Sequence, residues 1–409
     1  MKSIYLSLTI ILAAVTAESQ AAEKPKGPLT WQKIAAAASL NHPTMQALRL
    51  KRKELSGEEV KASALPNPEA DSKVLYNFDQ SHIEGEVTIT QKLELGGKRR
   101  ARINEARSDT RRYLLTLKIK ENTITGETIL LSNRLGQIQK EFKMLRETQR
   151  TMKNLMARYR RFPRLTPEMQ VSRSVYQLVL QDTERNQELL AAERDTITGR
   201  LSRWTGYKEE TIRAASFPDF KKLSDPGENL KVKSPLLGLL HENTSGAKAS
   251  LDAASALAVP DIALGPSFSG SGYKSTREIA AGFSVSMAIP VFNQNTGGIK
   301  IAGSRYRQTK KIQHIERQRL VSLRADMLKR YRNLFAATRR DKKNHHDRDH
   351  QLLHLNMSRG KVSPSLIIEF HRQNLESLKS SHALKQEALK LLMAIRSLDG
   401  TVHKELTHE

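Results

Sequence analysis

The chain has 409 residues, a formal net charge of +25 and no cysteine, and only 5% of its residues are aromatic. The lack of cysteine excludes disulfide bonds and a lipidated cysteine anchor, and the low aromatic content is typical of long helices rather than of a compact enzyme core. The length is sufficient for two ordinary domains or for one elongated repeat.

Residues 1–22 show the features of a secretory signal peptide in the right order. Lys2 gives a positive start, an apolar run extends from Ile4 to Val15, and small residues follow at the spacing of a cleavage site. The apolar run is too short to span a membrane as a helix. We therefore expect an exported protein, and export makes nucleic acid a poor partner for the positive charge.

The first repeat, residues 23–204, begins with a helix over about 29–65 that is interrupted near Pro43. The period then changes to two, which predicts a pair of strands over about 70–95. The strands are each about ten residues long, with one apolar face and one polar face. The apolar positions that we expect to face lipid are Val74, Tyr76, Phe78, Val87 and Ile89.

The stretch QKLELGGKRRAR, residues 91–102, joins the second strand to a dense basic helix start. Gly96 and Gly97 permit a sharp backbone turn, so we expect a strand-to-helix joint here. The stretch from residue 98 to about 160 contains no proline and predicts a helix roughly 90 Å long, which requires coiled-coil or bundle packing. Cations at its N-terminus oppose the helix dipole, so we expect acidic neighbours or anionic lipid beside residues 98–102.

A tip turn is predicted at about 161–167, where a proline and a new N-cap interrupt the helical pattern. Its tip residues are Arg164, Leu165 and Thr166, and Thr166 caps a helix that runs to about residue 204. A linker over 205–234 follows, rich in proline, glycine and lysine.

The second repeat, residues 235–400, has the same order of elements, and residues 401–409 form a tail. Strands are predicted over about 261–292, a glycine-opened helix follows, and a tip turn lies at about 358–364. The matching landmarks recur roughly 200 residues apart, which indicates internal duplication. The strand residues expected to face lipid are Ile262, Leu264, Phe268, Phe283, Val285, Met287 and Ile289; the joint residues are Gly297 and Gly298; the tip residues are Gly360, Lys361, Val362 and Ser363.

The predicted fold is mostly α-helical with a small membrane-embedded β part. An apolar sheet face must be covered, and no compact layer in the sequence is left to cover it. Strands of about ten residues can cross a bilayer, but lipid tolerates no unpaired strand edge, so the sheet must close into a barrel. Four strands are too few to close, and we therefore expect several protomers to contribute strands.

With these motifs, the chain resembles the TolC family of outer-membrane efflux channels over nearly all of the mature sequence. The stretches QKLELGGKRRAR and IPVFNQNTGGI and the two tip turns carry the resemblance, and the first is most similar to the heavy-metal branch of CzcC- and CusC-like proteins. The resemblance implies a homotrimer in the outer membrane of a Gram-negative bacterium. Its twelve-stranded β-barrel would continue into an α-helical periplasmic tunnel, whose tips dock on a periplasmic adaptor and an inner-membrane pump.

The implied function is a passive exit duct for small solutes, with heavy-metal cations as one class of cargo. No catalytic motif is present, and we expect neither enzymatic activity nor a cofactor. Two alternatives remain open: a periplasmic coiled-coil scaffold or adaptor, and the outer-membrane channel of a type I secretion system.

One histidine-rich segment has the spacing of a metal site. His346, His350 and His354 recur every four residues and would share one helical face, where imidazoles can hold zinc or copper. A solvated, charge-rich coiled-coil face explains the same pattern, and we favour that interpretation, so no metal site is expected.

Overall fold

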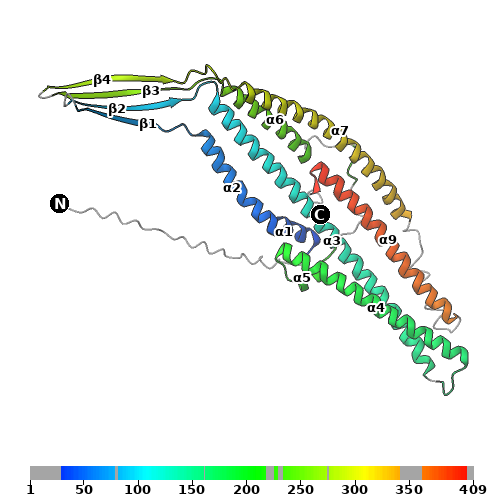
Figure 1. The fold of residues 1–409 in the computed structure, drawn as a ribbon. Coiled ribbons are helices and arrows are strands. Elements are labelled where there is room, and N and C mark those ends of the chain that lie inside the picture. The colour runs from blue at the N-terminus through cyan, green and yellow to red at the C-terminus, as the bar shows by residue number, and fades with distance from the viewer. Residues whose placement is uncertain are drawn as a thin grey trace, which may run out of the picture.

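The computed structural model describes residues 29–78, 82–160, 162–217, 225–228, 234–273, 276–340 and 362–402. This part of the chain is a long, curved layer of helices with one small antiparallel sheet that projects from one end (Figure 1). The mostly helical fold class with a small β part is therefore confirmed.

The sheet consists of two hairpins that lie far apart in the sequence. Strands β1 (Glu69–Asn77) and β2 (His82–Leu93) form the first hairpin, and β3 (Ile262–Tyr273) and β4 (Thr276–Met287) form the second. The strand order is β1-β2-β3-β4, because β2 pairs with β3. Strands β1 and β4 are consequently the two edges.

The helices of the first half surround one very long helix. α3 (Lys98–Tyr159) has 62 residues, which corresponds to roughly 93 Å. α1 (Trp31–Asn41) and α2 (Pro43–Ser63) pack on the part of α3 nearer the sheet, and α4 (Pro167–Thr205) packs on the distal part. One long helix thus lies against shorter helices placed end to end (Figure 1).

The second half has the same plan. α6 (Pro235–Ala256) and α9 (Pro364–Asp399) follow each other along α7 (Thr296–Arg340), and both also contact α3. The two halves therefore lie side by side. The stretch predicted as a linker contains the short helix α5 (Glu209–Arg213), and Ser216 forms a parallel bridge with Thr30.

The hydrophobic core lies between the helices and not beneath the sheet. The largest buried clusters join α1, α3, α7 and α9 in one group and α1, α3, α4 and α5 in another. None of the helices in the described residues is both long and apolar enough to span a membrane.

Candidate functional site

The first candidate site is the apolar face of the sheet. The register pairs Tyr76 with Ile83, Val87 with Phe268 and Leu264 with Val285, and side chains alternate along each strand. All the predicted lipid-facing residues that lie in strands therefore share one face: Val74, Tyr76, Val87, Ile89, Ile262, Leu264, Phe268, Phe283, Val285 and Met287.

Nothing in the described part of the chain covers this face. Val74, Phe283 and Val285 are 70%, 65% and 64% exposed, and all residues of β1 are exposed. Phe78 and Ile289 are also exposed but lie just beyond the ends of β1 and β4. An apolar surface of this extent needs a hydrophobic environment or a partner.

The opposite face of the sheet is mostly polar or small, although Leu75, which lies across from Glu84, also belongs to it. Lys73 lies directly across from Glu86, and Thr88 lies across from Ser267. On β4 this face carries Ser284 and other small residues. The sheet is therefore amphipathic across its thickness.

Gly265 allows an unusually close approach between the central strands β2 and β3. A Cβ atom at Gly265 would lie 1.9 Å from the carbonyl oxygen of Ile89. The next residue, Pro266, has no N–H to donate to a neighbouring strand. This pair was not predicted from the sequence, although Gly-Pro inside an alternating strand is a signal for such an irregularity.

The first strand-to-helix joint lies at Gly96 and Gly97, between β2 and α3. Both residues have left-handed backbone conformations, with φ of +68° and +79°. A Cβ at Gly96 would approach Cβ of Val259 to 2.6 Å, so glycine is required here for space as well as for conformation.

The second joint differs from the sequence prediction. The left-handed residue is Asn295, with φ of +54°, whereas Gly297 and Gly298 lie in the first turn of α7. Asparagine tolerates this conformation because its short side chain forms local hydrogen bonds. The side chain also contacts another element, because Nδ2 of Asn295 donates to the carbonyl of Ala254 in α6 at 2.8 Å. Gly298 is needed for a different reason, namely space, because a Cβ atom at this position would lie only 2.3 Å from Oδ1 of Asn295.

Most of the basic residues that open α3 have partners within the protein. Lys98 Nζ lies 2.6 Å from Asp261, and Arg102 pairs with Glu94. Arg99 donates to the carbonyl of Ser63 at 2.7 and 2.9 Å, at the C-terminus of α2. Acidic neighbours and the negative end of α2 thus offset the unfavourable charge.

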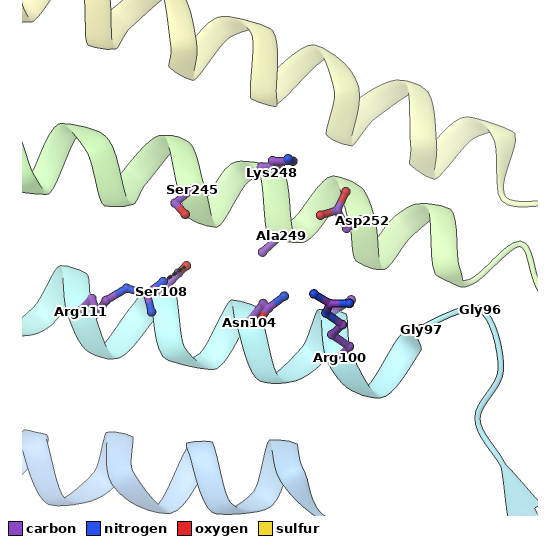
Figure 2. A pocket seen from close by; sticks show the side chains of 11 residues that line it. Gly96, Gly97, Arg100, Asn104, Ser108, Arg111, Ser245, Lys248, Ala249 and Asp252 are labelled. Carbon is purple, nitrogen blue, oxygen red and sulfur yellow. Dashed lines mark hydrogen bonds between the residues drawn. The ribbon is translucent and has the colours of Figure 1, made fainter.

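Arg100 is different from its neighbours because it lines a polar groove between α3 and α6. Figure 2 shows its side chain directed towards α6, where Lys248 and Asp252 lie. Asn104 and Arg111 continue the groove along α3.

The described parts of both tip turns are capped helix starts. Thr166 Oγ1 accepts a hydrogen bond from the N–H of Met169 at 3.2 Å, and Ser363 Oγ accepts one from Leu366 at 3.4 Å. Arg164 is exposed, and Leu165 is half-buried. Val362 packs on a small core that includes Tyr176 and Ile367.

Some predicted site residues fall outside the described residues. They are Gly360 and Lys361 of the second tip and the three histidines at 346, 350 and 354. Among the residues that are described, no group of three or more histidine, aspartate or glutamate side chains is arranged to hold a metal ion.

A buried polar network in the middle of the helices was not predicted. Nδ1 of His382 lies 2.6 Å from Oε1 of Glu141, and Arg134 bridges Glu141 and Glu193 at 2.8 and 2.7 Å. Burial alone would raise the pKa of Glu141, but the hydrogen bonds from His382 and Arg134 outweigh it, so the pKa is lowered. The network connects α3, α4 and α9.

The fold is similar to that of solved outer-membrane channels. The outer-membrane channel OprN has a TM-score of 0.70 at 13% identity, and the alignment covers 90% of this chain and 90% of OprN. The open MtrE channel of Neisseria gonorrhoeae has a TM-score of 0.67 at 14% identity, covering 91% of this chain and 89% of MtrE. CusC has a TM-score of 0.64 at 14% identity, covering 95% and 96%.

The sequence matches no protein-family model and no curated protein. At these low identities the similarity concerns the fold, so the chain has the fold of outer-membrane channel proteins. CusC is no more similar than the other two channels, and the heavy-metal branch therefore remains a prediction.

Proposed function

We propose that this chain is one protomer of an outer-membrane exit channel. The observation that carries the proposal is a four-stranded sheet with two unpaired edges and an uncovered apolar face. In a bilayer the apolar face would contact lipid, but each open edge would leave backbone groups unsatisfied. Three copies, each pairing β4 with β1 of the next, would close a twelve-stranded barrel.

In this arrangement the helices form a periplasmic tunnel that continues the barrel. The polar face of the sheet lines the pore, and both tip turns lie at the far end of the tunnel, where an adaptor and an inner-membrane pump would dock. Residues 23–204 and 235–400 then serve as two equivalent repeats. The solved relatives support this assembly by their fold, since OprN and MtrE are described as outer-membrane channels.

The channel works without chemistry of its own. Solutes pass along the polar interior, and opening is a rearrangement of helices at the tips. We propose small solutes as the cargo, with heavy-metal cations as one class. Comparing the growth of a deletion strain on toxic metals and on organic dyes would separate these two classes.

The proposal is tested on the full-length protein expressed in a Gram-negative host. We expect it in the outer-membrane fraction, as a detergent-extracted trimer that dissociates only on heating, with step-like conductance in planar bilayers. A water-soluble monomer without conductance would contradict the channel and favour the periplasmic scaffold.

A further inference from the structure

The groove between α3 and α6 lies beside the first strand-to-helix joint. It begins at Gly97, where α3 starts, and its walls carry Arg100, Arg111, Lys248 and Asp252 (Figure 2). It is therefore located where the proposed barrel meets the tunnel.

Two cations in this groove are not neutralised by the protein. Arg100 and Lys248 are exposed residues, and neither has an ion pair or hydrogen bond with any part of the chain that the structure describes. By contrast, Lys98, Arg99 and Arg102 in the same helical turn are all engaged. Three of the four cations between residues 98 and 102 thus have partners within the protein, whereas the side chain of Arg100 is directed into the groove.

The remaining charges keep the groove positive. Arg111 lines the wall but pairs with Glu242 at 2.8 Å. Asp252 is the one carboxylate among the lining residues, and it follows Lys248 by four residues on α6. With Arg111 compensated by Glu242, two cations against one anion still leave the lining with a net positive charge.

The start of α3 adds further donors. Its N-cap residue is Gly97, which has no side chain to accept hydrogen bonds from the first-turn N–H groups. The N–H of Lys98 already donates to the carbonyl of Leu95 at 3.4 Å, and that of Ala101 donates to Gly97 at 2.9 Å, which leaves the two N–H groups between them for an anion. A planar guanidinium together with an ammonium suits the several oxygens of a phosphate group.

We propose that this groove binds a phosphate group through Arg100, Lys248 and the first turn of α3. The phosphate group belongs either to the headgroup of an anionic phospholipid or to a soluble solute. Binding of a lipid phosphate rests on the proposed function, because the strand-to-helix joint lies at the level of the lipid headgroups only if the sheet is embedded in the membrane.

The test uses the full-length protein in a neutral detergent. Wild type is compared with the double variant Arg100→Gln/Lys248→Gln and with the control Arg107→Gln/Lys310→Gln, which removes two exposed cations outside the groove. Each protein is titrated with inorganic phosphate and with short-chain phosphatidylglycerol, and short-chain phosphatidylcholine reports binding through the lipid tails. A charge-conserving variant, Arg100→Lys/Lys248→Arg, shows whether any loss follows from charge or from misfolding.

We expect the groove variant to bind phosphatidylglycerol at least about tenfold more weakly than wild type, since it loses two charge-assisted contacts. The control and the charge-conserving variant should stay within about threefold of wild type. A dependence on the two cations seen only with inorganic phosphate would identify a soluble solute as the source. Equal affinities of the groove variant and wild type for both probes would overturn the proposal.

Trimer content and conductance are measured on the same samples. A conducting trimer without cation-dependent phosphate binding refutes the groove site alone. A soluble monomer refutes the channel, and the phosphate titration still tests the groove.

Discussion

At the scale of single residues, Arg324 shows how the helices are connected near their middle. It is the largest fully buried side chain in the described residues, and its guanidinium forms two 2.8 Å hydrogen bonds with the carboxylate of Asp399. It also donates to backbone carbonyls of residues 226–228. One side chain on α7 thus holds both the end of α9 and the segment that leads to α6.

Replacing Asp399 should therefore destabilise the protein. Asp399→Ala leaves Arg324 as a buried, unpaired cation, and we expect a loss of about 3–5 kcal/mol, measured by denaturant unfolding in detergent. Glu316→Ala removes the partner of the exposed Arg319 on the same helix and should change stability by less than about 1 kcal/mol. Similar losses in the two variants would contradict this role of the buried pair.

Gly265 is a second residue with a specific requirement. Because a Cβ there would collide with the carbonyl of Ile89, Gly265→Ala should separate β2 from β3 and lower the amount of folded trimer in the outer membrane. Gly85→Ala is the matched control, since a Cβ at Gly85 meets no atom within 4 Å. Equal trimer yields from the two variants would show that the strands adjust to the added methyl group.

The buried carboxylate of Glu141 should make stability depend on pH. Its pKa is lower in the folded protein than its ordinary value of 4.5. Its contribution is therefore fully present above about pH 4.5 and is lost as the pH falls through the lower folded-state pKa. Glu141→Gln should unfold with a flatter pH profile than wild type below about pH 4.5. The exposed control Glu188→Gln should retain the wild-type profile, and a steep profile in Glu141→Gln would exclude this carboxylate as the source.

At the scale of elements, local patterns predicted far more than contacts between distant segments did. The strands, the 62-residue α3 and the proline-started α4 were predictable, because alternation, proline-free length and capping residues act within a few positions. The role of Asn295 and the network around Glu141 were not. The role of Asn295 depends on its contact with Ala254 near the end of α6. The network around Glu141 joins residues more than 200 positions apart.

The two faces of β4 should respond differently to charge. Val285→Lys places an ammonium on the apolar face, which should cost about 2–4 kcal/mol near the bilayer midplane and less towards its surface. Ser284→Lys places the same charge on the polar face at nearly the same depth. We expect trimer yield in the outer membrane to fall only for Val285→Lys. A fall of equal size for Ser284→Lys would mean that the faces are assigned incorrectly.

At the scale of the whole molecule, the protein is an open layer. Its sheet ends in two bare strands, and its helices end in α2 and α4 on one side and in α7 on the other (Figure 1). In the proposed assembly this layer closes by meeting further copies of itself, and the lack of cysteine makes that closure easy to test.

Cysteines placed on β1 and β4 should cross-link between protomers. The two edges of one sheet lie roughly 14 Å apart, three strand spacings, which is too far for a disulfide within a single copy. Asp71→Cys combined in turn with Ser284→Cys or Ser286→Cys, all on the polar face, should give covalent dimers and trimers on denaturing gels. Thr88→Cys with Ser267→Cys, a directly paired position, should give only an internal bond. Monomers alone from every β1–β4 combination would argue against edge-to-edge closure.

The pairing of β2 with β3 has a consequence for how the protein is made. About 170 residues separate the end of β2 from the start of β3. During synthesis the β1–β2 hairpin is complete before β3 and β4 have been made, and until then the backbone groups at both of its edges can pair with strands of other chains. Completion of the sheet therefore depends on a late, long-range strand pairing, and the first hairpin is prone to aggregation until the second hairpin joins it.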